Sequence, residues 1–210
     1  MIRILIADDH VLFREGLKQI LSKHSDLVVT DEVGNGKDAL DKIWSTDYDV
    51  VLLDISMPGQ TGWDILSEAK RQKPNLPILI LSMHPEDQYA IRMLKAGASG
   101  YVSKESVPDE LITAIRKVAG GGRYVSLALA EKLAYALNTQ SEKMPHQLLS
   151  NREFQVMCML ASGKSLKEIA DDLSLSEKTI TTYRARILEK LQMRNNVELT
   201  HYAIQHKLID

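Results

Sequence analysis

Residues 50–54 read Val50-Val-Leu-Leu-Asp54, four consecutive apolar side chains followed by a carboxylate. An apolar run without alternation is typical of a parallel strand that is buried on both faces. Short runs of this kind alternate with longer amphipathic stretches over the first 120 residues, which predicts a parallel sheet covered by helices on both faces. The expected strands are Ile2–Ala7, Leu27–Val33, Val50–Asp54, Ile78–Ser82 and Gly100–Val102, and the expected helices lie near residues 12–23, 36–46, 62–72, 86–96 and 108–119.

Three consecutive glycines, Gly120 to Gly122, mark the end of this domain, because the conformational entropy of glycine is too costly for a helix to continue through them. We therefore expect a first domain over residues 1–121 and a linker over residues 122–146 that contains a short helix near Ser126–Leu137. The remaining residues, 147–210, are expected to form a second domain.

Every local signal in the second domain is helical. Ser150 and Glu153 have the spacing of a capping box, and Gly163 is placed to end the helix that they begin. The pattern predicts an all-α domain of four helices. These follow Ser150, cover Lys167–Leu173, run from Ser176 to about Leu191, and cover roughly Val197–His206.

Composition limits the classes of protein that this chain can belong to. Its 210 residues, 44% hydrophobic content and formal net charge of −2 suit two small domains and exclude a whole-surface binder of nucleic acid or membranes, although a local basic stripe remains open. The single cysteine, Cys158, allows neither an internal disulfide nor a zinc cluster of cysteines. No stretch approaches the roughly eighteen apolar residues of a membrane span, and an acidic pair interrupts the N-terminus before a signal-peptide core forms. We expect an unprocessed, soluble, cytoplasmic protein.

Polar residues follow four of the five expected strands. Asp8 and Asp9 come after the first strand, Asp54 ends the third, Ser82 ends the fourth and Lys104 follows the fifth. Because ligands bind at the carboxyl ends of parallel strands, these side chains are the first candidates for chemistry. Three carboxylates need a cation, and an oxygen-only ligand set suits Mg²⁺ better than Zn²⁺. A lysine and a hydroxyl opposite them suit a phosphoryl group.

With Asp54 in the segment Leu53-Asp-Ile-Ser-Met-Pro-Gly59, this set resembles the receiver domain of two-component response regulators, a doubly wound, flavodoxin-like α/β fold. The resemblance spans the whole first domain and implies a sensor histidine kinase as phosphoryl donor. It also implies a role for each site residue. Asp54 is the phospho-acceptor, Mg²⁺ is bound by Asp8, Asp9, Asp54 and the backbone carbonyl of Ser56, Ser82 and Tyr101 form the switch pair, and Lys104 contacts the phosphate.

The third helix of the second domain has the profile of a DNA-recognition helix. Small, hydroxylated and basic side chains recur on one face, at the spacing i, i+3, i+4, i+7 and i+8 from Lys178, while apolar residues occupy the opposite side. Small residues let a helix enter the major groove, hydroxyls reach base edges, and cations neutralise phosphates. The candidate DNA contacts are Lys178, Thr179, Thr181, Thr182, Ala185, Arg186 and Lys190.

The motifs around this helix, in residues 149–153, 161–170, 175–180 and 190–191, resemble the LuxR-type helix-turn-helix domain of the NarL/FixJ class of response regulators. Because a single such helix buries too little surface for tight specific binding, we expect a homodimer on paired half-sites of promoter DNA. Phosphorylation then acts either by pairing two receivers or by releasing a masked helix, and the sequence leaves both routes open.

The combined interpretation is a phosphorylation-controlled transcription factor that modifies its own Asp54 and is not a turnover enzyme. Two alternatives remain open at this point. A phosphohydrolase also places aspartates at strand ends, and steady-state turnover of phosphoesters identifies it. A constitutive interaction module uses the same surfaces without phosphorylation, and its DNA affinity is unchanged by a phosphodonor.

Overall fold

The computed structural model describes residues 1–57, 61–83, 86–131, 144–206 and 208–209. The chain divides into two compact units, Met1–Leu133 and Ala134–Asp210. Among the described helices, none combines the length and the apolar character that a membrane crossing requires.

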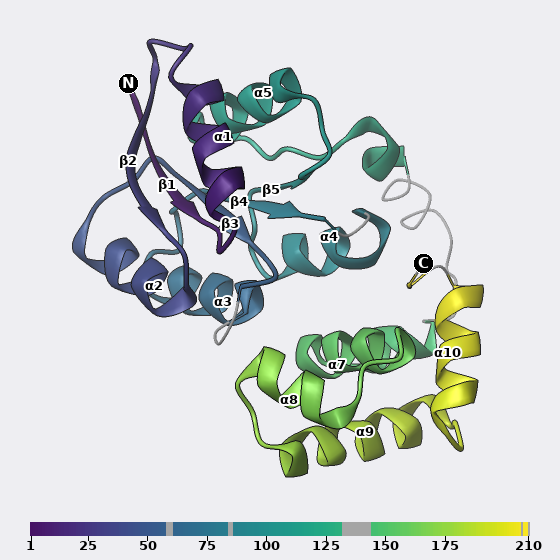
Figure 1. Cartoon of the computed structure of the whole chain (residues 1–210). Coiled ribbons are helices and arrows are strands. Elements are labelled where there is room, and N and C mark those ends of the chain that lie inside the picture. Colours follow the sequence, from purple (N-terminus) through teal and green to yellow (C-terminus); the bar gives the residue numbers. More distant parts are fainter. Residues whose placement is uncertain (58–60, 84–85, 132–143, 207, 210) are drawn as a thin grey trace. The chain divides into compact units, whose positions relative to one another are not determined.

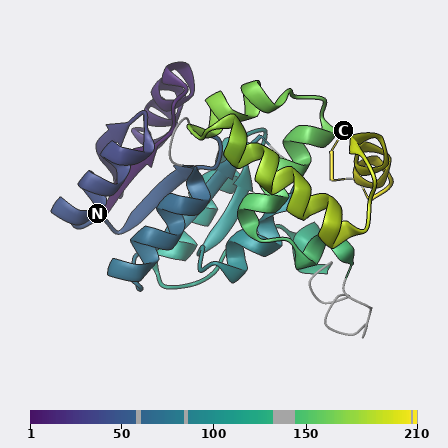
Figure 2. The same cartoon turned by 90° about the horizontal axis from the view of Figure 1, so that it is seen from below.

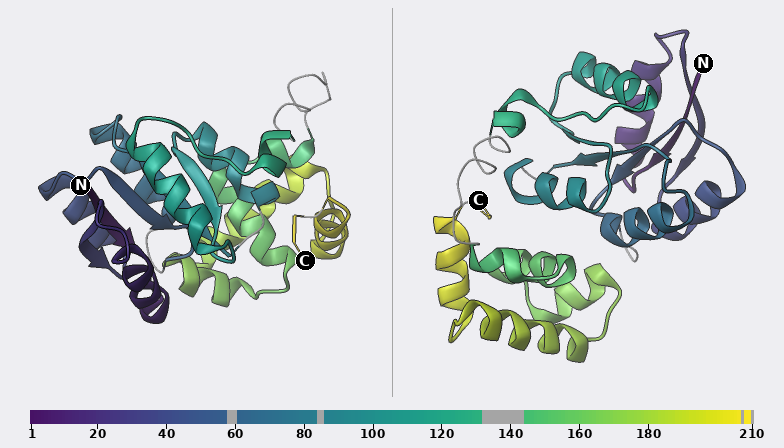
Figure 3. Two further views of the ribbon diagram at one scale, coloured as in Figure 1. Left: turned by 90° about the horizontal axis from the view of Figure 1, so that it is seen from above. Right: turned by 180° about the vertical axis from the view of Figure 1, so that it is seen from behind.

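The first unit is a five-stranded, all-parallel sheet in the order β2-β1-β3-β4-β5, which confirms the expected fold class. Figure 1 shows α1 and α5 on one face and α2, α3 and α4 on the other. Helices α2 and α3 pack side by side (Figure 2), and α1 and α5 cover the opposite face (Figure 3). The elements are β1 Ile2–Ala7, α1 Val11–Leu21, β2 Leu27–Val33, α2 Gly36–Ser45, β3 Val50–Asp54, α3 Gly62–Gln72, β4 Ile78–Ser82, α4 Glu86–Lys95, β5 Gly100–Ser103 and α5 Pro108–Ala119.

Strand β3 is the centre of this sheet, and all five of its residues are buried. The residue register pairs Ala7 with Leu53, Asp54 with Leu81, and Ser82 with Ser103. The carboxyl ends of these strands therefore meet at one edge. Four strands have the predicted bounds, whereas β5 extends one residue further, to Ser103.

The segment after α5 returns to the sheet. Tyr124 forms an isolated parallel bridge with Gly100, and its hydroxyl donates to Glu110 at 3.0 Å. Leu129 is buried, and residues 127–131 are helical. The first part of the expected linker thus packs within the first unit. The rest of the helix expected over 126–137 lies outside the described residues.

The regular elements that the described residues of the second unit form are all helices. Both halves of the Ser150–Glu153 capping box are formed, and Gly163 has a φ of +84°, the left-handed backbone that favours glycine at a helix end. Ser176 accepts a hydrogen bond from the Thr179 amide and caps the third predicted helix. The elements are η1 Pro145–Leu148, α7 Asn151–Ala161, α8 Leu166–Leu173, α9 Glu177–Leu191 and α10 Asn196–Gln205.

Gly62 allows α3 to start directly against the end of β3. A Cβ atom at this position would lie 2.7 Å from the Ile55 Cα and 2.8 Å from the Asp54 carbonyl oxygen. We expect Gly62→Ala to lower the free energy of unfolding by about 1–3 kcal/mol, because neither backbone can move away freely. Gly16→Ala in α1 is the matched control, since no atom lies within 4 Å of its added Cβ. The control should gain about 0.5–1 kcal/mol. Urea unfolding measures both, and equal stabilities would contradict this packing.

Candidate functional site

Asp8, Asp54 and Lys104 form a buried triad at the carboxyl edge of the sheet. Asp8 follows β1, Asp54 ends β3, and Lys104 follows β5; their side chains are 0%, 1% and 4% exposed. The Lys104 Nζ atom lies 2.6 Å from Asp8 Oδ2 and 2.9 Å from Asp54 Oδ2. A single cation therefore bridges two carboxylates that water cannot reach, which places a reactive acidic group beside a fixed positive charge.

The electrostatics of Asp54 favour a further cation. Burial raises the pKa of the Asp54 carboxyl group above its usual value, and Asp8 adds to this rise, while Lys104 opposes it. The ionised carboxylate thus costs free energy in this position. A cation placed beside Asp54 would reduce that cost, and the neighbouring acidic groups attract one.

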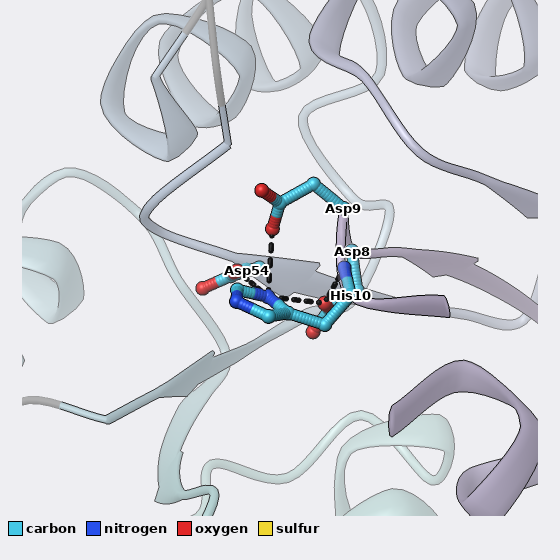
Figure 4. Close-up of side chains that lie close together, drawn as sticks. All are labelled: Asp8, Asp9, His10 and Asp54. Atoms are coloured by element: carbon cyan, nitrogen blue, oxygen red, sulfur yellow. Dashed lines mark hydrogen bonds and ion pairs between the residues drawn. The ribbon is translucent and has the colours of Figure 1, made fainter. Parts of the chain in front are cut away.

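Asp9 and His10 complete the cluster, as Figure 4 shows. The His10 Nδ1 atom lies 2.8 Å from Asp9 Oδ1 and 3.2 Å from Asp8 Oδ1. The His10 backbone amide also donates to Asp8 Oδ1 at 2.8 Å. Asp8, Asp9, His10 and Asp54 each offer a ligand atom, and these atoms all lie within 4.8 Å of one another.

The carboxylates of this cluster fit a divalent cation. Asp8 Oδ2 and Asp9 Oδ1 are buried atoms that accept no hydrogen bond from the described residues, since their ion pairs lack hydrogen-bond geometry. Such hard oxygen donors are the preferred ligands of Mg²⁺. Ser56 lies next to them, because its backbone amide donates to Asp54 Oδ1 at 3.1 Å. The sequence-predicted metal residues are thus brought together at one place.

Ser82 and Tyr101 are both fully buried on neighbouring strands, β4 and β5. The Ser82 carbonyl accepts a hydrogen bond from the Lys104 amide at 2.8 Å, which ties the end of β4 to the residue that carries the cation. The structure therefore places Ser82 and Lys104 together, while Tyr101 is packed inside the first unit.

Two residues of α1 contact this site although the sequence pattern does not predict them. The Phe13 ring lies under Lys104, with the Nζ atom 4.7 Å from the ring centroid. The Arg14 guanidinium donates to the Asp8 carbonyl at 2.6 Å. Both follow the acidic pair within six residues, but amphipathic spacing alone does not distinguish a side chain that folds back from one that faces solvent.

The α9 face predicted to read DNA is largely exposed to solvent. Ile180 and Ile187 are fully buried on the other side of the helix. A depression of about 340 Å³ lies along the exposed face and is lined by Ser176, Lys178, Thr179, Thr182, Tyr183 and Arg186. Within the predicted set, the exposed residues are Lys178, Thr181, Thr182, Ala185, Arg186 and Lys190, and Thr179 is half-buried.

Comparison with known proteins identifies both units. Residues 4–116 match the family described as "Response regulator receiver domain", and residues 147–203 match "Bacterial regulatory proteins, luxR family". The chain is 38% identical over 209 residues to the response regulator UvrY of Escherichia coli (strain K12), covering 99% of this chain and 96% of that protein. It is 36% identical over 211 residues to the response regulator GacA of Pseudomonas aeruginosa, covering 100% and 99%. The chain belongs to the response regulator family.

Solved structures agree with this assignment. This response regulator matches RcsB of Salmonella enterica serovar Typhimurium bound to promoter rprA in the presence of the phosphomimetic BeF₃⁻, with a TM-score of 0.70, 27% identity and coverage of 96% and 98%. An RcsB–DNA complex matches with a TM-score of 0.61, 25% identity and coverage of 100% and 99%. The chain is thus a response regulator with a LuxR-type DNA-binding domain, and its function is regulation of transcription.

Lys190, one of the predicted DNA contacts of this response regulator, forms an ion pair within the second unit. The Lys190 Nζ atom lies 2.7 Å from Glu153 Oε2, and Glu153 is 4% exposed inside the capping box of α7. Burial opposes the ionisation of Glu153, but hydrogen bonds from Lys190 and Ser150 outweigh it and lower the pKa of the carboxyl group. Lys190 therefore joins α9 to α7.

We expect Lys190→Ala to lower the stability of the second unit by about 1–2 kcal/mol, because it leaves Glu153 buried without its cation. A depressed pKa stabilises the fold above the usual Glu pKa, and this contribution is lost as the pH falls through the depressed value. The Tm of the variant should thus approach that of the native chain in acid. Lys178→Ala, exposed on the same helix, is the control and should leave Tm unchanged. Equal Tm values for native and Lys190→Ala at neutral pH would contradict the role.

Proposed function

We propose that this response regulator accepts a phosphoryl group on Asp54 from a sensor histidine kinase, with Mg²⁺ held by Asp8, Asp9, Asp54 and the Ser56 carbonyl. The observation that carries this proposal is the buried Asp54 carboxylate, which lies 2.9 Å from Lys104 Nζ and beside the acidic pair. In the phosphorylated state the chain forms a homodimer on paired half-sites of promoter DNA.

Each residue of the site has a separate role in phosphoryl transfer. An Asp54 oxygen attacks the phosphorus, the phosphorus–nitrogen bond of the phosphohistidine breaks, and the imidazole of the kinase leaves with the bonding electrons. Mg²⁺, when bound by the acidic residues, would neutralise negative charge on the phosphoryl oxygens. Lys104 then holds a phosphoryl oxygen, and the Ser82 hydroxyl and Tyr101 respond as the switch pair.

The proposed DNA interface is the exposed face of α9. Lys178 and Arg186 neutralise phosphates, while Thr182 and Ala185 lie where a helix meets base edges in the major groove. Thr179, Thr181 and Lys190 complete the proposed set. The structures of the relative RcsB on promoter DNA support this use of the second unit.

The proposal includes the organisation of the chain and its location. Residues 1–121 form the receiver, 122–146 connect the two domains, and 147–210 bind DNA; the contacts of Tyr124 and Leu129 with the first unit support a connection whose first part packs on the receiver. The chain acts in the cytoplasm, where promoter DNA lies, and it modifies itself once and does not turn over a substrate.

A small phosphodonor tests this proposal on the full chain. With Mg²⁺ present, intact-mass spectrometry should find one adduct of about 80 Da, the mass of a single added phosphoryl group, and the modified chain should bind DNA more tightly as a dimer. Steady-state release of phosphate from phosphoesters would identify a hydrolase instead. Unchanged DNA affinity of the modified chain would identify a constitutive module.

Lys104→Ala should uncouple the response from phosphorylation. The variant keeps the Asp54 nucleophile and the acidic pair, but it lacks the ammonium group that lies 2.9 Å from Asp54. We expect an adduct in the mass spectrum and loss of the gain in DNA affinity, which for coupled sites is about 5- to 150-fold. Lys23→Ala, an exposed lysine outside the site, is the control. A Lys104→Ala chain that dimerises and binds DNA like the native chain after phosphodonor treatment would contradict this role.

A further inference from the structure

The His10 ring occupies a position that the oxygen-only description of this site does not explain. Its Nδ1 atom lies 2.8 Å from Asp9 Oδ1, 3.2 Å from Asp8 Oδ1 and 4.0 Å from Asp54 Oδ2 (Figure 4). Ligand atoms bonded to one ion at about 2.1 Å are about 3.0 Å apart when adjacent and about 4.2 Å apart when opposed in an octahedron. The nitrogen therefore lies at the spacing of adjacent ligands from Asp8 Oδ1 and Asp9 Oδ1, and near the spacing of opposed ligands of an octahedral ion from Asp54 Oδ2.

The ring has no other role among the described contacts. His10 is the N-cap residue of α1, yet its side chain makes no capping hydrogen bond. Among the described residues, its side-chain polar contacts go to the acidic cluster, and 61% of the side chain is exposed, which leaves it accessible to an incoming ion. The fully buried Asp8 carboxylate turns Oδ1 toward His10, while its Oδ2 lies beside the Lys104 ammonium group.

The formal charge also matches a divalent ion. Lys104 pairs with Asp8 Oδ2 and Asp54 Oδ2, so the three carboxylates and this lysine together leave two negative charges when His10 is neutral. Lys104 approaches Asp8 through Oδ2, whereas His10 approaches it through Oδ1. The lysine and the ring thus use different oxygens of that buried side chain.

We propose that His10 Nδ1 is a fourth protein ligand and makes this edge of the sheet a mixed nitrogen–oxygen site for a borderline first-row metal ion, Zn²⁺ foremost. An imidazole ligand favours Zn²⁺ strongly, whereas Mg²⁺ prefers oxygen and keeps its waters. The inference rests on the proposed function for its three carboxylates and adds the ligand that selects the metal. Zn²⁺ bound here occupies the place of Mg²⁺ and therefore opposes phosphorylation.

Calorimetric titration of the full chain with Zn²⁺ and, separately, with Mg²⁺ tests the proposal. The native chain should bind Zn²⁺ more tightly than Mg²⁺, and His10→Asn should lower Zn²⁺ affinity by at least about tenfold, the lower bound seen when even outer-shell partners are lost. Asparagine is a preferred N-cap residue, so the variant keeps the start of α1. Titration with Co²⁺ gives a second readout, because the visible absorption of the bound ion reports its nitrogen ligand and should change in His10→Asn.

His206→Asn is the matched control, since the His206 and His146 rings lie with centroids 5.9 Å apart and form another place where metal could collect. This control should keep the native Zn²⁺ affinity. Native Zn²⁺ affinity in His10→Asn would overturn the proposal, whatever the result for His206→Asn, as would equal affinities for Zn²⁺ and Mg²⁺ in the native chain. Failure of Mg²⁺-dependent phosphorylation with the His10-dependent Zn²⁺ site intact would reject the proposed function alone.

Discussion

Asp54→Asn should abolish the phosphoryl adduct on treatment with a small phosphodonor and Mg²⁺. The amide is a poor nucleophile, and the substitution also removes one of the charges that face the proposed metal site. Intact-mass spectrometry should therefore find the added mass of about 80 Da in the native chain and only background in the variant.

The Tm of the Asp54→Asn variant distinguishes a specific loss of phosphorylation from unfolding of the chain. Because burial raises the pKa of Asp54, the ionised group disfavours the folded state at neutral pH, and its cost falls as the pH decreases through the raised value. Asn carries no charge, so the Tm of the variant should not drop at pH 7. Asp47→Asn is the matched control, with a side chain that is 92% exposed and paired only with Lys73 among the described ion pairs. Adduct formation at the native level in Asp54→Asn would reject Asp54 as the acceptor.

The double variant Lys178→Ala with Arg186→Ala should lose most DNA binding. Both side chains are exposed on the same face of α9 as Thr182. In the proposed DNA interface each cation contacts a phosphate and releases counterions on binding. We expect the slope of log affinity against log salt to fall by about one unit for each lost phosphate contact. Affinity at physiological salt should fall at least about tenfold, since each charge-assisted hydrogen bond contributes about 1.5–3 kcal/mol.

A second pair of substitutions distinguishes the effect of net charge from the effect of position on α9. Lys23→Ala with Lys37→Ala removes the same charge from exposed positions of the receiver and should leave the salt slope unchanged. Thr182→Ala should instead change which DNA sequences are preferred, because a hydroxyl at a base edge carries sequence information and a phosphate contact does not. A salt series in which the α9 double variant binds like the native chain would show that α9 is not the reading helix.

Local patterns were sufficient for the architecture. The run Val50–Leu53 predicts a doubly buried strand because its signal is contained in consecutive side chains, and β3 has these bounds. The Ser150–Glu153 capping box and Gly163 likewise depend on neighbours within one helical turn or on a single backbone angle. Since parallel strands end at a common edge, the meeting of Asp8, Asp54 and Lys104 follows from the same reasoning.

Contacts between distant parts of the chain required the folded structure. Nothing adjacent to Lys190 in sequence indicates its ion pair with Glu153, 37 residues away. The bridge from Tyr124 to β5 lies in a segment whose glycines and weak patterning favour a linker. In both cases the partner is selected by helix and strand packing, which brings together groups that no periodicity relates.

Within the site itself, His10 separates what the sequence predicts from what only the folded structure decides. The sequence places it after two aspartates, and carboxylates alone predict an oxygen-ligand site for Mg²⁺. Whether its ring turns toward the cluster or toward solvent depends on the backbone at the start of α1 and on the position of Asp54 at the end of a different strand. The sequence by itself thus determines where strands and helices begin and end, because hydrophobic and capping preferences act between neighbouring residues. The direction of each polar side chain depends on charges from distant parts of the chain, which only the packed sheet brings near.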